Sequence, residues 1–504
     1  MNALPAPPYP SPDHVDLWSL REDTLVEFPE HDGGTAQLTT RWGDLTLPGT
    51  GPLLRSALER MSYGPVSLHN IAGGADYREL TACLGDLEHI VIRSLSGPDG
   101  RPLLSAVPIS RRARFRTSVP GPGTLHRLSR FALIRTAAGG LWVESPLSGH
   151  RVELHRAEAT WLLGCFGRAT TAEAVADRLG LPTGLVRAAV AYLTAVRMLV
   201  SAVGGGGRPG FAEFPEDRDP ALASWSPFDL MLHSRSRLGR HDDPFGAAER
   251  GAPDAAAATR APYGAPAPIP LPRPALARLL SQDPPITAVL EARRSVRTYG
   301  SEPLSLARLG ELLYRAARIR TPESGSLENG SPDAPAVSTG SRPYPSLGGS
   351  YPLELYITAG NCAGLARGTY HYDPLALALR PLAAPAAAVD ELLAQARISA
   401  SLTTEPPVLI TMTARFGAMN RRYDGLAYSG LLKEVGALQQ TLYLVSTAMG
   451  LAPCALAIGD SDLLAHAFGL DWLKESSVGE FVLGPLPAEE LAGESGNTPV
   501  YSRF

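Results

Sequence analysis

One stretch of this chain of 504 residues contains very few side chains that a folded core could bury. Residues 247–274, AAERGAPDAAAATRAPYGAPAPIPLPRP, are mostly Ala, Pro and Gly, a composition typical of a linker. A second break, GGGGRPG at 204–210, precedes the segment SWSPFDLMLHSRSRLGRHDDPFG. We therefore expect folded regions at 1–115, 116–204 and 276–504, with a connecting arm and linker over 205–275.

Charge and composition exclude several classes of protein. The formal net charge is -4 and no basic patch dominates the sequence, so we expect neither a nucleic-acid nor an anionic-lipid partner. The start MNALPAPPYPSPDHVDLW has no signal-peptide pattern, and no run of eighteen apolar residues occurs. We expect a cytoplasmic protein without a membrane segment. The four cysteines are far apart, which predicts buried thiols and no metal site: Cys83, Cys165, Cys362 and Cys454.

The region 116–204 mixes short strands with helices. The strands are expected in FALIRTAAGGLWVES (131–145) and HRVEL (150–154), and the helices over 157–168, 172–179 and 185–199. This order predicts a winged helix. The region 1–115 is expected to form a similar unit, with strands in 34–47, helices over 52–61 and 75–88, and a strand over 89–95.

A winged helix can bind DNA or a peptide. The helix expected over 185–199 offers mainly Arg187 and Arg197 to solvent, a poor set for base edges and phosphates. The same architecture can accept an extended peptide as an added strand on the edge of the wing. We therefore prefer peptide binding to DNA binding for this region.

The segment LEARRSVRTYGSEPLSLARLGELLYRAAR, 290–318, contains a dense group of hydrogen-bond donors. These are Arg293, Arg294, Ser295 and Arg297. Guanidinium groups make paired contacts with phosphate oxygens, and a serine hydroxyl adds a further donor. The cluster suits a phosphate, although a solvated charged turn would have the same composition.

Two further segments have the composition of a ligand-binding loop and a central helix. In SRPYPSLGG the prolines stiffen the loop, and Gly348 and Gly349 allow the backbone to approach a flat ring. In GLLKEVGALQQTLYLVSTAMG apolar residues recur at three and four positions (432, 435, 438, 442, 445 and 449), and Gly436 would allow close helix approach. The following GLAPCALAIGD leads through a short strand to Gly459.

These motifs resemble a known superfamily. RRSVRTYGSEPLS resembles the opening motif of the FMN-dependent nitroreductase-like superfamily. The segments 341–357 and 415–460 resemble the SagB-type dehydrogenases, which oxidise azoline rings in ribosomal peptides, and LHSRSRLGRHD resembles their linker. The resemblance covers roughly residues 225–485. The two N-terminal regions resemble the PqqD-like winged-helix peptide clamps that are fused to some of these enzymes.

The resemblance implies an α+β nitroreductase-like catalytic domain over 276–504 that binds FMN. It places the FMN phosphate at the arginine cluster, and the rest of the cofactor near Pro345, Ser346, Gly348 and Gly459. It implies a homodimer through the catalytic domain, with two FMN sites at the interface. The substrate would be a precursor peptide whose thiazoline or oxazoline rings were made by a separate cyclodehydratase, a further expected partner.

The resemblance also points to a catalytic pair in GAMNRRYDGLAY, 417–428. The family commonly has Lys-Tyr here, whereas this chain has Arg422 and Tyr423. A guanidinium stays protonated and cannot be the base. We expect Arg422 to favour the phenolate form of Tyr423, which would then remove the proton of the ring. A plainer alternative is that both residues cap the following helix and contact solvent.

Three other functions fit parts of this pattern. An NAD(P)H-dependent nitroreductase or flavin reductase would use the same fold, but would not need 200 N-terminal residues. A flavin-dependent reductase of dehydroamino acids would run the redox chemistry in the opposite direction. A catalytically inactive scaffold would keep the peptide-binding regions alone.

Overall fold

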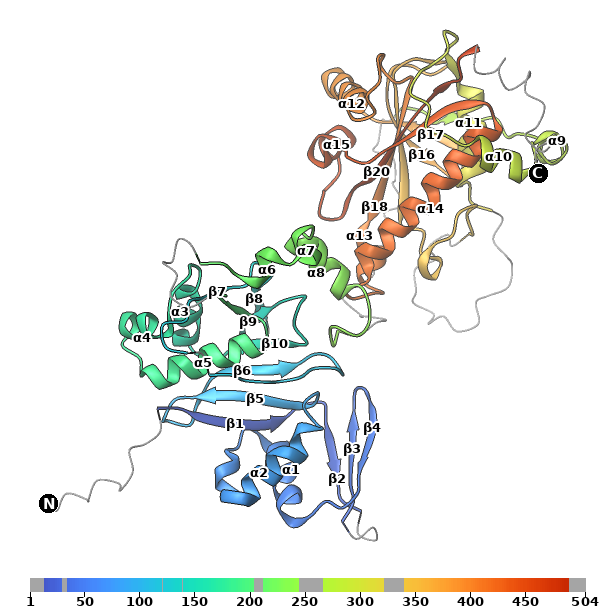
Figure 1. Ribbon diagram of the computed structural model, residues 1–504. Helices are drawn as coiled ribbons and strands as arrows, with labels where there is room; N and C mark the ends of the chain where they lie inside the picture. Colours follow the sequence, from blue (N-terminus) through green and yellow to red (C-terminus); the bar gives the residue numbers. More distant parts are fainter. Residues whose placement is uncertain are drawn as a thin grey trace, which may run out of the picture. The chain divides into compact units, whose positions relative to one another are not determined.

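The computed structural model describes residues 13–29, 34–119, 121–137, 139–203, 212–243, 266–320 and 340–488. The chain divides into two compact units, Met1–Asp243 and Pro244–Phe504 (Figure 1). The division falls within the predicted arm and linker. Most of the Ala/Pro-rich linker, residues 247–265, lies outside the described residues.

The N-terminal unit contains a six-stranded sheet whose strands come from both predicted N-terminal regions. In spatial order the strands are β1 (Val15–Leu20), β5 (Val91–Ser96), β6 (Pro102–Pro108), β10 (His150–Leu154), β9 (Gly140–Glu144) and β8 (Leu133–Ala137). Strand β6 pairs with β10, so the sheet is continuous across residue 115. Strand β6 is the edge strand of the first region and β10 that of the second. Their pairing forms hydrogen bonds for N–H and C=O groups that would otherwise be unpaired at each edge. The two regions therefore form one sheet and not two independent units.

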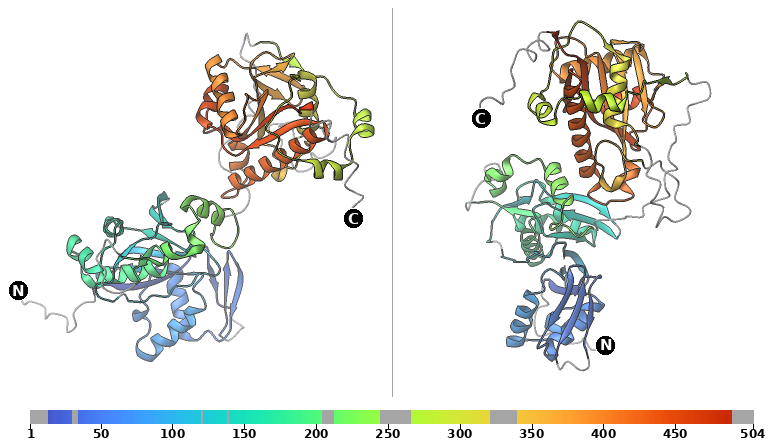
Figure 2. Two further views of the ribbon diagram at one scale, coloured as in Figure 1. Left: turned by 45° about the horizontal axis from the view of Figure 1, so that its top comes forward. Right: turned by 90° about the vertical axis from the view of Figure 1, so that its right-hand side faces the viewer.

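Helices pack on this sheet in two groups (Figure 2). The first group is α1 (Pro52–Tyr63) and α2 (Gly74–Gly85), which share a core with β1 and a small sheet of β2 (Leu25–Glu27), β3 (Ala36–Thr40) and β4 (Gly43–Leu47). The second is α3 (Ala157–Cys165), α4 (Ala172–Leu179) and α5 (Thr183–Ala195), which cover β5, β6 and β10. The strands and helices were largely predicted. The winged-helix assignment itself stays a prediction.

Some predicted helices are too long, and the one expected over 157–168 ends at Cys165. The helix expected over 185–199 ends at Ala195, because Arg197 takes a left-handed conformation with φ of 59°. The chain then forms β11 (Leu199–Ser201), which pairs with β7 (His126–Leu128). The arm that follows contains three short helices, α6 (Pro215–Arg218), α7 (Pro220–Ala223) and α8 (Pro227–Arg235).

The C-terminal unit is built on a seven-stranded antiparallel sheet. Its strands in spatial order are β12 (Ile269–Pro270), β17 (Ala378–Pro381), β16 (Gly368–Asp373), β14 (Leu353–Ala359), β18 (Val408–Arg415), β20 (Glu475–Pro485) and β19 (Leu451–Leu456). Strand β12 lies inside the stretch predicted to be linker, and Leu271 is buried in the core. The last residues of that stretch therefore belong to the C-terminal unit.

Helices cover both faces of this sheet. On one face lie α11 (Leu306–Ala317) and α14 (Ala427–Ala448), and on the other α12 (Ala386–Ser399) and α15 (Ser461–Phe468). Successive strand residues alternate between the two cores: Leu355 faces α11 and α14, whereas Tyr356 faces α12 and α15. The remaining elements are α9 (Leu276–Gln282), α10 (Ile286–Ala292), α13 (Phe416–Asn420), β13 (Leu304–Ser305) and β15 (Cys362–Ala363).

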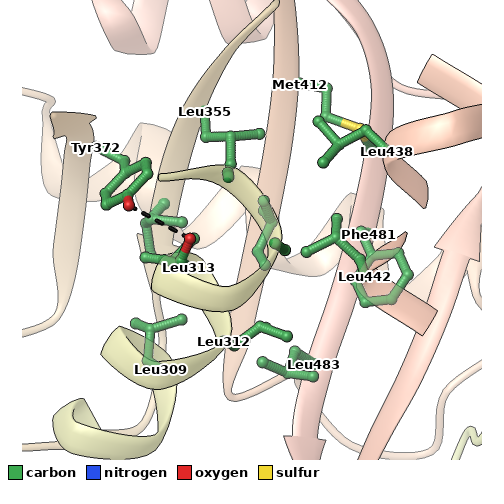
Figure 3. Close-up of a cluster of buried hydrophobic side chains, with 14 of the residues drawn as sticks. Leu309, Leu312, Leu313, Leu355, Tyr372, Met412, Leu438, Leu442, Phe481 and Leu483 are labelled. Atoms are coloured by element: carbon green, nitrogen blue, oxygen red, sulfur yellow. Dashed lines mark hydrogen bonds between the residues drawn. The ribbon is translucent and has the colours of Figure 1, made fainter. Parts of the chain in front are cut away.

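The main core lies between α11, α14 and the sheet (Figure 3). Leu309, Leu312 and Leu313 of α11 meet Leu438 and Leu442 of α14, and the buried Tyr372 hydroxyl donates to the Leu313 carbonyl at 3.3 Å. The predicted apolar stripe of α14 is correct at 435, 438 and 442. At the N-terminal end, however, Leu431 is buried and Leu432 is exposed. Gly436 is exposed, and no described residue comes within 4 Å of a Cβ built at this position, so the predicted close helix approach is not seen among the described residues.

Three smaller expectations can be compared with the described part of the chain. Cys362 and Cys454 are buried as predicted and Cys165 is half-buried, but Cys83 is exposed. No cluster of three or more metal-ligating side chains occurs there. Nor does any described helix have the length and apolar character needed to cross a membrane.

Candidate functional site

The predicted pair Arg422 and Tyr423 follows α13, and both side chains lie against the loop that contains the predicted residues Pro345, Ser346 and Gly348. Gly348 has φ of 59°, a conformation that favours glycine. A Cβ atom on Gly348 would overlap the Tyr423 hydroxyl, and Arg422 Nη1 would lie 3.9 Å from it. The Tyr423 hydroxyl therefore lies against Gly348, and a larger residue at 348 would displace it.

Arg422 is attached to the same loop by two hydrogen bonds. Its Nη1 donates to the Gly348 carbonyl at 3.2 Å and to Ser350 Oγ at 3.0 Å. Helix α14 begins at Ala427 with Leu426 at the N-cap and no side-chain capping bond. The alternative that Arg422 and Tyr423 cap this helix is therefore wrong, and the structure holds the two side chains against the glycine loop.

Glu434 of α14 anchors this loop and was missed in the sequence analysis. Its Oε1 accepts a hydrogen bond of 2.7 Å from the Leu347 N–H, and its Oε2 is buried with no hydrogen-bond partner in the described part of the chain. The side chain is 4% exposed, and this burial raises the pKa of its carboxyl. An acidic residue between Leu431 and Leu438 on the apolar stripe was the signal that could have identified it.

Tyr423 also borders a cavity of about 460 Å³. The walls come from α13, from the turn that follows it and from the start of α14, including Asn420, Asp424 and Tyr428. Tyr423 is half-buried and Arg422 is exposed. A substrate group can therefore reach this region from solvent.

The predicted phosphate cluster follows α10 and lies near Tyr443 of α14. Ser295 Oγ is 2.7 Å from the Tyr443 hydroxyl, which accepts a hydrogen bond from the Ala455 N–H at 2.8 Å. The Arg293 guanidinium lies 5.3 Å from the centre of the Tyr443 ring. Arg294 and Arg297 are exposed. Within the described residues, no carboxylate forms an ion pair with Arg293 or Arg297.

Gly459 lies beside a buried carboxylate. A Cβ atom at this position would overlap the Glu480 carboxyl group, so a larger residue would have to displace that side chain. Burial raises the pKa of Glu480 to about 7. Both residues border a cavity of about 490 Å³ on the side of the sheet that α12 and α15 cover.

The structure thus brings most of the predicted residues together in two groups, whereas Gly459 lies beside Glu480. Tyr423, Arg422 and the loop Pro345–Gly348 lie near Glu434, whereas Arg293 and Ser295 lie near Tyr443. Tyr443 lies nine positions after Glu434 in α14, a rise of about 14 Å. No hydrogen bond or ion pair between described residues joins the two groups directly.

Family models match both units of the chain. Residues 290–484 match the model described as the nitroreductase family. The C-terminal unit therefore has a nitroreductase-like fold. Its α+β fold was predicted and is confirmed. Residues 126–242, which precede it, match the model described as cyanobactin oxidase ThcOx. A nitroreductase-like domain supports an oxidoreductase activity for the chain.

Individual proteins are similar to part of this chain. A Methanocaldococcus jannaschii protein named as a nitroreductase is 29% identical over 163 residues, 32% of this chain and 73% of that protein. A chain of the Escherichia coli microcin synthetase McbBCD complex, solved with truncated pro-MccB17, is 22% identical, with TM-score 0.31 and coverages of 44% and 89%. A nitroreductase from Desulfovibrio desulfuricans, solved with FMN, is 17% identical, with TM-score 0.26 and coverages of 44% and 96%.

Proposed function

We propose that this chain is an FMN-dependent dehydrogenase that oxidises thiazoline or oxazoline rings in a ribosomally made precursor peptide to thiazole or oxazole. The observation that carries the proposal is the contact of Tyr423 and Arg422 with one glycine loop of the nitroreductase-like domain. The match of residues 126–242 to cyanobactin oxidase ThcOx supports a peptide substrate.

The donor cluster fits the phosphate of FMN. Arg293 and Arg297 have no carboxylate partner within the described residues, so their guanidinium groups can bind an anion. The Ser295 hydroxyl, in contrast, is bonded to Tyr443, so we assign it to positioning the cluster. The loop Pro345–Gly348 and Gly459 would contact the remainder of the cofactor. When bound, FMN supplies a two-electron acceptor.

The residues of the chain account for the proton transfer. Conversion of an azoline to an azole removes two hydrogens from the ring, one as a proton and one with its bonding electron pair. The Tyr423 oxygen, as phenolate, would take the proton from the α-carbon. The Arg422 guanidinium is bonded to the same loop, so its positive charge can compensate the negative charge of the phenolate.

The separation of the two residue groups supports a homodimeric enzyme. Neither group alone provides both phosphate donors and a proton acceptor. We propose that the cluster at Arg293 in one protomer and the loop at Tyr423 in another copy complete one site. A cyclodehydratase must make the azoline first, so we expect it to work with this enzyme. Residues 1–204 would bind the peptide.

Mass spectrometry of a synthetic azoline peptide tests the proposal. Purified protein reconstituted with FMN is incubated in air with the peptide, and each azoline should lose two hydrogens. NAD(P)H consumption with a quinone, and no change in peptide mass, would contradict the proposal and favour a reductase. Protein that remains colourless after addition of FMN would favour the scaffold.

A further inference from the structure

The N-terminal unit contains a basic pocket that is separate from the residues discussed above. It is a cavity of about 480 Å³ where four chain segments meet: 110–114 after β6, 147–150 at the start of β10, 195–197 at the end of α5, and 238–240 in the arm. Its walls include Arg112, Arg114, Arg197 and Arg240, and no Asp or Glu. We refer to this cavity, defined by the four arginines, as the basic pocket.

Three of the four arginines have no acidic partner within the described residues. Arg114 lies 3.8 Å from Glu88, but Arg112, Arg197 and Arg240 form no ion pair there. All three are exposed. Positive charges that share one cavity repel each other, so an anion in the cavity would gain from all of them.

Arg197 occupies a position where a side chain is unfavourable. The Arg197 N–H bonds to the Thr194 carbonyl at 3.0 Å, and the Met198 N–H bonds to the Leu193 carbonyl at 2.8 Å. These two bonds form a Schellman motif, in which the left-handed residue is usually glycine. Arginine at this position, with φ of 59°, carries a conformational cost and places a guanidinium group at the basic pocket.

The arm contributes an apolar side chain, Leu238, to the wall of the basic pocket. Ser110 Oγ donates to the Gly239 carbonyl at 2.6 Å, which fixes the turn that carries Leu238 and Arg240. Leu238 is 79% exposed. His150 also lines the pocket, but it is buried, and this lowers its pKa to about 4. The imidazole is therefore neutral at neutral pH, and the arginines supply the charge.

We propose that the basic pocket binds an acidic segment of the peptide partner that also carries an apolar side chain. The guanidinium groups would pair with carboxylates, and Leu238 would contact the apolar side chain. A compact phosphate would leave Leu238 exposed, which favours a peptide over an inorganic anion or a nucleic acid. The inference rests on the proposed function only in taking the partner to be a peptide.

Fluorescence anisotropy with the full-length protein tests this inference. The probe is a fluorescein-labelled peptide, Gly-Glu-Leu-Glu-Glu-Leu-Glu-Gly, compared with an analogue that has Gln in place of every Glu. The variant Arg112→Gln/Arg197→Gln/Arg240→Gln should bind the acidic peptide about tenfold more weakly. The control Arg60→Gln/Arg78→Gln/Arg168→Gln removes the same charge from exposed positions outside the pocket and should change affinity less than about twofold.

Three outcomes would overturn the proposal. They are equal weakening by both triple variants, equal binding of the Gln analogue, and tighter binding of a double-stranded DNA oligonucleotide. Oxidation of an azoline peptide without acidic residues should be unchanged in the pocket variant, which separates this inference from the proposed function.

The single variant Arg197→Gly tests the pocket with a substitution that should not impair folding. Glycine adopts the left-handed conformation without strain. This gain offsets the greater entropy of glycine in the unfolded chain, so Tm should not fall. Affinity for the acidic peptide should nevertheless fall about threefold. Unchanged affinity, or affinity lost only together with Tm, would contradict a binding role for Arg197.

Discussion

The Glu434 carboxylate accepts a hydrogen bond of 2.7 Å from the Leu347 N–H, immediately before Gly348. This bond connects the buried face of α14 to the loop that contacts both Tyr423 and Arg422. Further bonds make the loop compact, because Ser346 Oγ accepts from the Tyr351 N–H and Ser350 Oγ donates to the Leu347 carbonyl. Glu434 is therefore a positioning residue for the proposed catalytic pair.

Replacement of Glu434 should impair catalysis without removing the cofactor. Glu434→Ala leaves the Leu347 N–H without its acceptor and should lower the free energy of unfolding by about 1 to 3 kcal/mol. The kcat for ring oxidation should fall, with FMN content unchanged. Glu434→Gln keeps an acceptor oxygen and should retain more activity. Urea unfolding and steady-state kinetics measure these effects, and equal kcat values for the Ala and Gln variants would contradict the positioning role.

The sequence predicted where helices and strands form better than it predicted which residues contact each other in the fold. The periodicity of α14 identified a central helix, yet it did not show that Glu434 lies on the buried face. One sheet continues across the predicted boundary at residue 115, because β6 pairs with β10, and no local sequence pattern contains that long-range contact. Similarly, composition gave no reason to place β12 in a sheet.

The candidate site shows the same limit. Gly348 and Tyr423 were selected separately, from the loop composition and from a family resemblance, and only the fold shows that they touch. The sequence could group Arg293 with Ser295, because these residues are only two positions apart. It could not reveal Tyr443 as the partner of Ser295, nor the meeting of Arg112, Arg197 and Arg240 in one pocket.

Removal of the Tyr423 hydroxyl should abolish ring oxidation. Tyr423→Phe keeps the ring against Gly348 but lacks the oxygen proposed to accept the proton, so FMN should remain bound while azole formation stops. Tyr314→Phe is a suitable control, since this tyrosine lies on α11 and its hydroxyl has no hydrogen-bond partner in the described residues. Product is measured by mass spectrometry. Oxidation by Tyr423→Phe at the wild-type rate would require a different mechanism.

Arg422 should contribute through its charge and its bonds to the loop. Arg422→Ala loses the donor to Gly348 O and Ser350 Oγ, and we expect kcat to fall about tenfold or more. Arg422→Lys keeps a positive charge and one donor group, and should retain substantial activity. Both rates are measured under saturating peptide. An Ala variant as active as the Lys variant would show that the charge has no role.

Arg293 should contribute to retention of FMN. Loss of a charge-assisted pair in Arg293→Ala is expected to weaken FMN binding by about 1 to 3 kcal/mol. Arg278→Ala serves as the control, because it removes an exposed arginine of the same unit that is paired with Glu311. Flavin absorbance after dialysis measures retention. If Arg293→Ala and wild type release FMN equally, the phosphate site lies elsewhere.

Glu480 should make stability depend on pH. Burial raises its pKa from about 4.5 to about 7, so the folded state binds the proton more tightly than the unfolded state. The resulting stabilisation is fully present below pH 4.5 and is lost as pH rises through 7. The shift corresponds to a change in the free energy of unfolding on the order of 3 kcal/mol.

The variant Glu480→Gln removes this titration while keeping a similar shape. The free energy of unfolding of Glu480→Gln minus that of wild type should therefore be larger at pH 8 than at pH 5, as measured by urea unfolding at both values. Glu391→Gln, at an exposed position of α12, provides the matched control and should behave like wild type at both pH values. A stability difference between Glu480→Gln and wild type that is the same at pH 5 and pH 8 would show that Glu480 does not titrate in this range. The carboxylate would then be ionised beside Gly459 throughout, and the cavity next to it would contain a fixed negative charge.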